Sequence, residues 1–178
     1  MKIILIGYPG SQKLVPASKY LVDKYLTGFD VVWLNYTGEI EGWSKFVADY
    51  LQKLEDEKII FALDDYLIAG TLQLLDVNFG QEVCAKLCYC TPEENEEYPV
   101  TTQYTLWNRK YLISLLEQTT NPWDFEIRGS RIFKATGMKM AHRPCLKYNV
   151  HSALSKGWEG VKLDGLNDED IKEVQKRI

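Results

Sequence analysis

The sequence lacks the features that mark membrane-spanning, secreted and zinc-cluster proteins. No apolar run approaches the ~20 residues of a membrane-spanning helix. The apolar stretch within Met1–Tyr8 is too short for a signal peptide. There is no CxxC pair, and the two histidines have no recognised zinc-binding spacing. The four cysteines are therefore expected to be buried, reduced thiols in a cytoplasmic protein with no membrane span.

An excess of positive charge is also missing. The net charge of −4 argues against a broad, nonspecific nucleic-acid surface, so no nucleic-acid partner is expected. A local basic pocket remains open, because five cations lie close together in the sequence: Arg128, Arg131, Lys134, Lys139 and Arg143. The 46% hydrophobic and 26% charged residues are typical of a globular chain, and 178 residues are most simply one domain.

The hydrophobic pattern of the first half predicts alternating strands and helices. Apolar runs indicate buried strands over Lys2–Tyr8, Asp30–Tyr36 and Lys58–Leu63. A helix ending near Leu26 and a second one over Trp43–Glu55 separate them. This β-α-β-α-β order implies right-handed crossovers and a parallel sheet. We therefore expect an α/β fold, with a mostly parallel sheet sandwiched by helices in a single compact domain.

The second half is less regular. The pattern there predicts strands and helices in the order strand Val83–Cys90, helix Leu106–Gln118, a helix capped by Asn121 with Pro122 in its first turn, strand Arg143–Val150, and a terminal helix capped by Asn167. Residues 1–66 are expected to form a nucleotide-binding half of the domain and residues 67–178 an acceptor-facing half.

Two acids, Asp64 and Asp65, end the third predicted strand. Open α/β sheets bind ligands at the carboxyl ends of their strands. Adjacent carboxylates repel each other and are costly to desolvate unless a cation neutralises them. Mg²⁺ or Mn²⁺ escorting a diphosphate suits such a pair, because these ions favour carboxylate and phosphate oxygens. The alternative is a solvated pair that closes the strand and caps the next segment.

The segment Ile6–Lys13 follows the first strand and is similar to a phosphate-binding P-loop. That loop needs a glycine immediately before its lysine and a serine or threonine immediately after it. Gln12 and Leu14 occupy these positions, so both the backbone freedom and the metal-binding hydroxyl are missing. A P-loop-like phosphotransferase is thus disfavoured, although the turn could still contact a nucleotide through its backbone.

Several further segments accompany the acids in a fixed order. They are Trp43-Ser44, Leu63–Tyr66, Gln103 with Trp107, Pro122–Ser130 and Lys156–Trp158. Together they resemble small proteins similar to glycosyltransferase family 2, which have the GT-A nucleotide-diphospho-sugar transferase fold. The resemblance covers most of the chain, and Pro122–Ser130 carries most of its weight. The last segment permutes the family's closing Gly-Lys/Arg-Trp.

The resemblance implies metal-dependent transfer of a sugar from a nucleotide-diphospho-sugar to a hydroxyl acceptor such as a glycan, with inversion. Asp64 and Asp65 would hold Mg²⁺ or Mn²⁺, with His151 as a candidate third ligand. An inverting transferase needs a carboxylate base. Asp124 and Glu126 are the candidates, and Glu126 is favoured because residues two apart on a helix face different directions. The competing interpretation is a noncatalytic relative that binds sugar nucleotides or carbohydrate.

Further residues are expected around the substrates. Gln103 and Asn108 are candidates to bind donor sugar or acceptor hydroxyls. By analogy of fold, the candidate nucleoside contacts are Tyr8, Pro9 and Asn35. Tryptophan rings stack on sugar faces or fill the core, and both roles are open for Trp107, Trp123 and Trp158.

Overall fold

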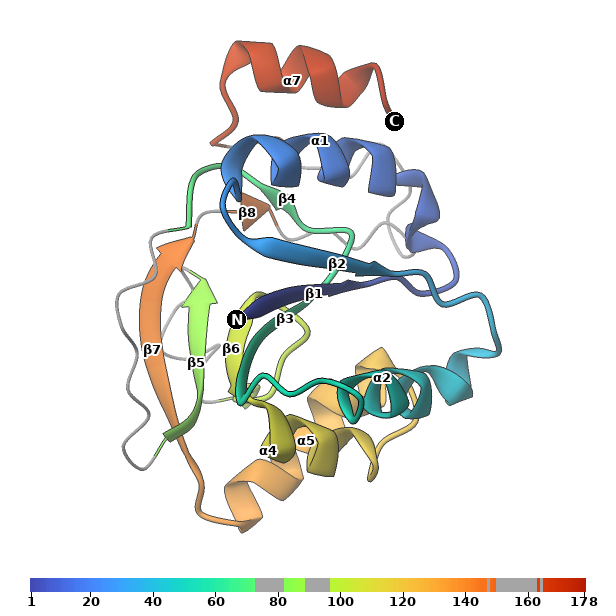
Figure 1. The fold of residues 1–178 in the computed structure, drawn as a ribbon, viewed down its shortest axis with the longest axis vertical. Coiled ribbons are helices and arrows are strands. Elements are labelled where there is room, and N and C mark those ends of the chain that lie inside the picture. The colour runs from blue at the N-terminus through green and yellow to red at the C-terminus, as the bar shows by residue number, and fades with distance from the viewer. Residues whose placement is uncertain (73–81, 89–96, 147, 150–162, 164) are drawn as a thin grey trace.

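A six-stranded sheet forms the centre of the computed structural model of this protein (Figure 1). The structure describes residues 1–72, 82–88, 97–146, 148–149, 163 and 165–178. Across the sheet the strands are, in order, β2 (Asp30–Leu34), β1 (Lys2–Ile6), β3 (Lys58–Leu63), β6 (Thr105–Asn108), β5 (Glu82–Cys88) and β7 (Lys139–Leu146).

Most of the strands point the same way. β1 pairs in parallel with β2 and β3, and β5 pairs in parallel with β7. β6 lies between the two parallel groups and is antiparallel to both β3 and β5. A two-stranded antiparallel sheet, β4 (Leu67–Ile68) with β8 (Tyr148–Asn149), lies apart from this one. The predicted mostly parallel α/β sheet in a single compact domain is confirmed.

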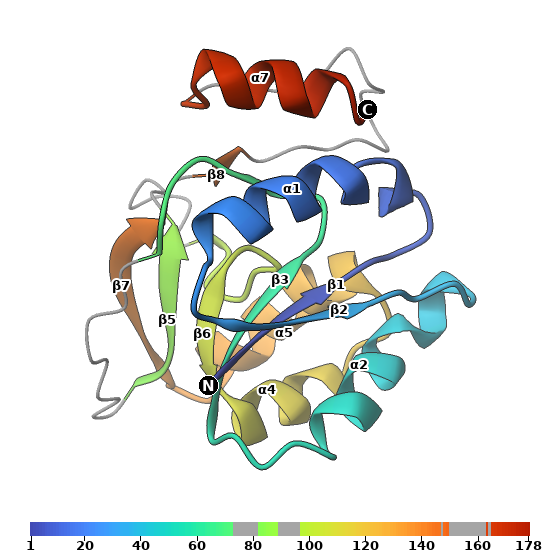
Figure 2. The same ribbon diagram turned by 45° about the horizontal axis from the view of Figure 1, so that its top comes forward.

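Helices cover both faces of the sheet (Figures 1 and 2). One layer contains α2 (Trp43–Leu51), α4 (Arg109–Leu116) and α5 (Pro122–Ala135), and the other contains α1 (Val15–Tyr25) and α7 (Asp168–Gln175). Short 3-10 turns, η1 (Ser11–Lys13) and η2 (Ile40–Gly42), precede α1 and α2. Within the described residues, no helix is long and apolar enough to cross a bilayer.

The core lies between the sheet and the helices. The apolar side chains of β1 and β3, from Ile3 to Ile6 and from Ile59 to Ala62, are completely buried because helices cover both faces of these strands. Each such side chain contributes roughly 1.5–3 kcal/mol. On the α2–α5 side, four aromatic rings meet at centroid distances of 6.1–6.5 Å: Trp43, Phe61, Trp107 and Phe125.

Two predicted elements differ from the structure. The strand expected over Arg143–Val150 is replaced by β7, which begins earlier at Lys139 and ends at Leu146 where it pairs with β5, and by the short β8 of the other sheet. The helix expected over Leu106–Gln118 begins only at Arg109, because Thr105–Asn108 forms β6. The buried edges of β3 and β5 need a strand to satisfy their backbone groups, and this tertiary demand overrides the local helical spacing. Asn108 becomes the N-cap of α4, accepting a hydrogen bond from the Tyr111 amide at 3.2 Å.

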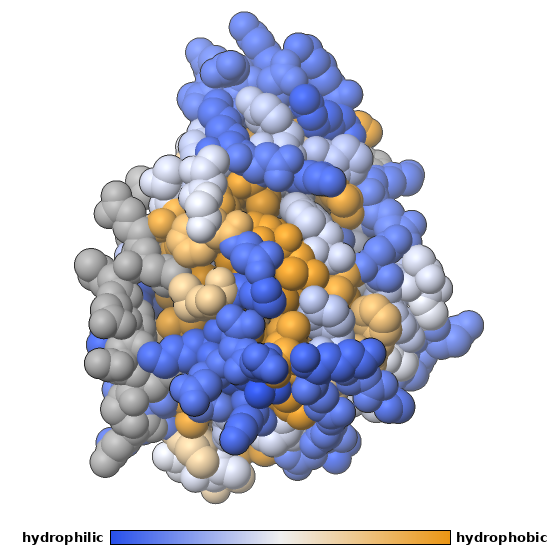
Figure 3. Space-filling model, viewed as in Figure 1, coloured by the Kyte–Doolittle hydropathy of each residue, from blue (hydrophilic) through white to orange (hydrophobic). Residues whose placement is uncertain are grey.

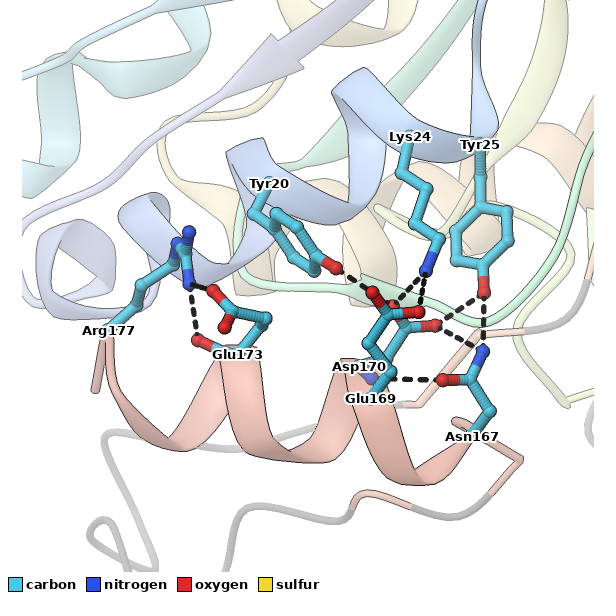
Figure 4. Close-up of polar contacts among 8 residues, drawn as sticks. All are labelled: Tyr20, Lys24, Tyr25, Asn167, Glu169, Asp170, Glu173 and Arg177. Carbon is cyan, nitrogen blue, oxygen red and sulfur yellow. Dashed lines mark hydrogen bonds and ion pairs between the residues drawn. The ribbon is translucent and has the colours of Figure 1, made fainter.

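The last helix is held to α1 through polar side chains (Figure 4). Asp170 is completely buried and accepts hydrogen bonds from Lys24 at 2.7 Å, Tyr20 at 3.2 Å and Tyr25. Asn167 caps α7 as predicted, accepting from the Asp170 amide at 2.9 Å. We call Tyr20, Lys24, Tyr25, Asn167 and Asp170 the α7 clasp. Figure 3 shows hydrophilic residues over this end of the molecule and apolar ones gathered toward the middle.

Hydrogen bonding decides the charge of the carboxyl in the α7 clasp. Burial raises the pKa of Asp170, but the hydrogen bonds from Lys24 and Tyr25 outweigh burial and hold that pKa below its usual value. A buried carboxylate with this many donors is stable as an anion. The clasp therefore stabilises the docked helix with charge-assisted hydrogen bonds in place of a large apolar face.

Candidate active site

The two acids lie where β3 ends. The Asp64 amide donates to the Ile6 carbonyl at 3.1 Å, which continues the pairing of β1 and β3 past the last paired residues. Asp64 is 4% exposed and Asp65 is 2% exposed. The alternative of a solvated acid pair is therefore wrong, since both carboxylates are nearly removed from water.

Each carboxylate of the pair is short of hydrogen-bond donors. Oδ1 of Asp64 and Oδ1 of Asp65 are buried and have no partner among the residues that the structure describes. Asp65 Oδ2 accepts one hydrogen bond, from the Tyr8 hydroxyl at 2.7 Å. Buried, unsatisfied carboxylate oxygens are costly, so this arrangement favours a cationic partner.

The same shortage raises the pKa of both acids. Burial is the main cause for Asp64, whose pKa rises to about 7; a hydrogen bond from Ser11 opposes this rise and the charge of Asp65 adds to it. Burial likewise raises the pKa of Asp65 to about 6, opposed by the Tyr8 hydroxyl and assisted by the charge of Glu126. The pair is therefore partly protonated near neutral pH, and a metal ion that bound there would displace these protons.

Gly7 has no side chain, and this leaves room for the Asp64 carboxylate. A Cβ on Gly7 would lie 2.7 Å from Asp64 Oδ2, which no side chain could tolerate without displacing the acid. The Gly7 carbonyl accepts a hydrogen bond from Trp43 Nε1 at 3.1 Å, so α2 fixes the same backbone from the other side. The P-loop-like segment is thus a tight turn whose first glycine makes room for Asp64.

A pocket of about 230 Å³ lies beside the acids, at the ends of β1, β2 and β3 and the start of α1. Its lining residues are Gln12, Val15, Trp33, Leu34, Asn35 and Asp64. Asn35 was predicted as a nucleoside contact. Asp64 was predicted as a metal ligand, and Gln12 lies in the turn that could contact a nucleotide through its backbone. No sequence signal marks Val15, Trp33 and Leu34, because they look like ordinary helix and strand residues. Pro9 is exposed in the turn and is not among the lining residues.

Glu126 reaches the acid pair from α5. Its Oε1 atom accepts hydrogen bonds from Thr101 Oγ1 at 3.1 Å, Thr102 Oγ1 at 2.8 Å and the Thr102 amide at 2.8 Å. The Thr102 carbonyl accepts from the Leu63 amide at 2.9 Å, which places this threonine pair beside the end of β3. These bonds all end on Oε1, which leaves Oε2 available to a substrate.

Asp124 has a different place. Its Oδ2 atom accepts from the Thr120 amide at 3.0 Å, and its own amide donates to Asn121 Oδ1 at 2.9 Å. Asp124 therefore caps the start of α5, where Asn121 is the predicted N-cap. Trp123, which lies between Asn121 and Asp124 in the sequence, is 49% exposed. Its ring meets the Tyr8 ring edge-on at a centroid distance of 6.1 Å.

Other predicted residues lie close to the cluster, away from it, or outside the described residues. Gln103 directly follows the threonine pair, and its amide donates to Thr101 Oγ1 at 3.2 Å. Asn108 pairs with Lys58 at the other end of β3, so the structure does not bring it to the acids. Trp107 is completely buried in the core and cannot stack on a sugar. His151 and Lys156–Trp158 lie outside the described residues.

The described residues fit a metal ion that is shared with a substrate. They contain no group of three or more His, Cys, Asp or Glu side chains that could hold a metal alone. Asp64 and Asp65 nonetheless present unpartnered buried oxygens. Mg²⁺ is commonly held by one or two carboxylates, with substrate phosphates and water completing its shell.

Comparisons with known proteins identify the fold. No family model and no curated protein sequence matches the chain. The catalytic domain of Drosophila beta1,4-galactosyltransferase 7 in complex with xylobiose is 12% identical, with a TM-score of 0.53, over 99% of this chain and 80% of that one. A glycosyltransferase involved in glycosylation of the major capsid of PBCV-1 is 12% identical, with a TM-score of 0.54, over 98% and 97%. The fold is that of the GT-A glycosyltransferases.

A further structure of the Drosophila enzyme shares this fold. It is a mutant in complex with manganese, UDP-Gal and xylobiose, 11% identical with a TM-score of 0.53, over 96% of this chain and 78% of that one. At these identities the likeness to GT-A enzymes establishes the fold alone. Membership of family 2 stays a prediction.

Proposed function

We propose that this GT-A protein is a glycosyltransferase that moves a sugar from a nucleotide-diphospho-sugar to a hydroxyl acceptor with the help of a divalent metal. One observation carries the proposal. Asp64 and Asp65 are almost buried at the carboxyl end of β3, and each has an oxygen with no hydrogen-bond partner among the described residues. A fold that needed only a strand end there would not bury two acids that each have one oxygen short of a donor.

The donor nucleotide is assigned to the pocket beside the acids, in the half formed by residues 1–66. The amide side chains of Gln12 and Asn35 offer hydrogen bonds to a base or ribose, and Trp33 offers an apolar surface. Asp64 is the charged member of the lining, so the pocket suits an uncharged nucleoside and leaves the diphosphate at the acids.

Asp64 and Asp65 would hold Mg²⁺ or Mn²⁺ with the diphosphate of the donor. When bound, the ion neutralises the charge that develops on the leaving diphosphate. The Drosophila neighbour in complex with manganese and UDP-Gal supports this assignment. Tyr8 donates to Asp65 Oδ2 and so fixes the orientation of that carboxylate.

Glu126 is the proposed general base. Thr101 and Thr102 hold its Oε1 atom, which fixes the carboxylate and keeps Oε2 for the proton of the acceptor hydroxyl. Attack from the side opposite the leaving diphosphate would invert the sugar. The Drosophila neighbour in complex with xylobiose supports a glycan acceptor.

The test is metal-dependent donor binding. Thermal melts with UDP-, GDP- and dTDP-sugars are expected to show stabilisation by one donor in the presence of Mn²⁺. Asp65→Asn should abolish that stabilisation, because an amide cannot replace a carboxylate ligand. Asp49→Asn is the matched control, since Asp49 is a surface acid paired with Lys45 on α2.

Two results would overturn the proposal in different ways. Absence of stabilisation by every donor, with and without Mn²⁺, would remove the donor site. Binding of a donor without release of nucleoside diphosphate, with any glycan acceptor or with water, would leave a noncatalytic sugar-nucleotide-binding relative.

A further inference from the structure

Positive charge is concentrated in one stretch of this acidic chain. Residues 127–158 contain seven Lys and Arg residues and no Asp or Glu. All 25 acids lie in the rest of the chain, together with the other 14 Lys and Arg residues. The net charge of −4 therefore conceals a basic region in an otherwise strongly acidic protein. Such asymmetry is typical of proteins that bind an anionic surface.

The described part of this basic stretch begins on the outer face of α5. Arg128 and Arg131 are exposed and have no ion pair or hydrogen bond within the described residues. Lys134 donates to the Glu97 carbonyl, which leaves its charge uncompensated. Among the described residues the two acids of α5 form no ion pair with these cations, and both accept hydrogen bonds from threonines.

Large apolar side chains are exposed on the same helix. Trp123 is 49% exposed and Ile127 is 47% exposed. These residues are four apart, as are Ile127 and Arg131, so they form one stripe along the outside of α5. We call Trp123, Ile127, Arg128, Arg131 and Lys134 the α5 face. Tryptophan and isoleucine interleaved with arginine and lysine are characteristic of helices that lie in a membrane interface.

We propose that the α5 face docks the protein on a lipid membrane with anionic headgroups. Trp123 and Ile127 enter the headgroup region, while Arg128, Arg131 and Lys134 bind lipid phosphates or carboxylates. The apolar members of the face favour a membrane over nucleic acid. Phosphate backbones attract the cations alone, and an exposed isoleucine gains nothing from them.

The face is continuous with the proposed catalytic site. Trp123 contacts the Tyr8 ring, and Tyr8 donates to Asp65. A membrane under the α5 face therefore brings its surface to the edge of the acid cluster.

The test is flotation of the metal-free protein with vesicles, which does not depend on donor binding or turnover. Vesicles of phosphatidylcholine alone are compared with equimolar phosphatidylcholine and phosphatidylglycerol. Each cation near an anionic membrane contributes about 1 kcal/mol, or about fivefold in partitioning. Arg128→Gln/Arg131→Gln should thus weaken binding about 25-fold. High salt should weaken wild-type binding as well.

A matched control removes the same charge elsewhere. Lys19→Gln/Lys172→Gln changes exposed lysines of α1 and α7, on the far side of the sheet, and should bind the anionic vesicles like wild type. Ile127→Asn tests the apolar part and should weaken binding several-fold, with salt dependence retained. Thermal melts check that each variant is folded.

Three outcomes would overturn the proposal. The first is equal binding by the double arginine variant and the double lysine variant. The second is equal binding to neutral and anionic vesicles. The third is binding to a DNA duplex that requires Arg128 and Arg131 but is insensitive to Ile127→Asn, with no binding to vesicles; this would assign the α5 face to nucleic acid.

Discussion

Three aspartates among the described residues are almost completely buried, and their surroundings differ between the α7 clasp and the end of β3. Asp170 in the α7 clasp accepts hydrogen bonds from Tyr20, Lys24 and Tyr25, and its pKa is lowered. Asp64 and Asp65 each have an unpartnered oxygen among the described residues, and burial raises the pKa of both. A buried acid with donors stabilises a fold. A buried acid with too few donors destabilises the fold unless a bound cation offsets its charge.

Substitution of Glu126 should have the largest effect of the series, because donors hold one oxygen of this carboxylate and none of those donors holds the other. Its Oε1 atom has three donors, while Oε2 is left for the substrate. Glu126→Gln is expected to lower sugar transfer by about a thousandfold while donor binding persists, since general bases contribute about 10²–10⁴. Release of nucleoside diphosphate measures this loss.

Asp124→Asn is the matched control for that prediction. It keeps an oxygen that can accept from the Thr120 amide and removes only the negative charge at the start of α5, so it should cost at most about 1 kcal/mol of stability and leave transfer nearly unchanged. A variant pair with the opposite pattern, in which Asp124→Asn is inactive and Glu126→Gln is active, would assign the base to Asp124.

The metal-free protein should lose stability as the pH rises from the usual aspartate pKa of 3.8 to the raised pKa of Asp64 at about 7. Asp64 takes up its proton below a pKa of about 7 when folded, against a usual value of 3.8. Between these values the folded state binds more protons than the unfolded state, so raising the pH favours unfolding, by roughly 2–4 kcal/mol in total.

Urea denaturation in EDTA at pH 5 and pH 8 measures the size of this loss. Asp64→Asn should remove most of it and make the metal-free protein more stable at pH 8. Equal pH dependence in wild type and Asp64→Asn would show that the buried acid carries no such cost.

An aspartate-to-asparagine substitution in the α7 clasp should have the opposite effect on stability, so the protein should become less stable. Asp170→Asn removes the anion that the Lys24 ammonium and the Tyr25 hydroxyl bind, and it is expected to destabilise the protein by about 2 kcal/mol. The stabilisation by Asp170 is present above its unfolded pKa and is lost as the pH falls through its lowered folded pKa. Urea denaturation at pH 7 tests the loss. Exposed Asp168 on the same helix is the control, and an equal effect of Asp168→Asn would contradict a specific clasp.

Tyr8→Phe should have the smallest effect of the series. It removes the one hydrogen bond that orients the Asp65 carboxylate, at 2.7 Å. Loss of such a supporting contact typically weakens metal affinity about tenfold. Titration of Mn²⁺ in the presence of the stabilising donor measures this change. Tyr36→Phe removes a hydroxyl bound to the Glu39 carbonyl and serves as control; equal affinity in both variants would show that Tyr8 does not orient the acid.

The sequence predicts the elements that depend on local side-chain contacts or on a clear hydrophobic pattern. The strands of the parallel half and the caps at Asn121 and Asn167 follow from apolar runs and side-chain chemistry, and the structure confirms them. The strand Thr105–Asn108 could not be predicted, because its conformation is imposed by β3 and β5 on either side. Helical spacing around Leu106 therefore gave the wrong element.

The candidate site divides in the same way. The position of Asp64 and Asp65 at a strand end is readable from the sequence, since strand ends of α/β sheets converge. The bonds from Thr101 and Thr102 to Glu126 are not readable, because they join segments 24 and 25 residues apart through the tertiary fold. The partners of Asp170 lie still further away, about 150 residues earlier in the chain.

The reversed direction of β6 has a consequence for how such proteins diversify. Because β6 runs against its neighbours, the residues that lead into it, Thr101–Tyr104, reach the edge of the sheet where β3 ends. Substitutions and insertions in this approach can alter the groups facing an incoming acceptor without shifting the register of β1 with β3. Under the proposed function, such changes would alter the acceptor contacts while the donor site at β1 and β3 stays intact, a separation that originates in the direction of a single four-residue strand.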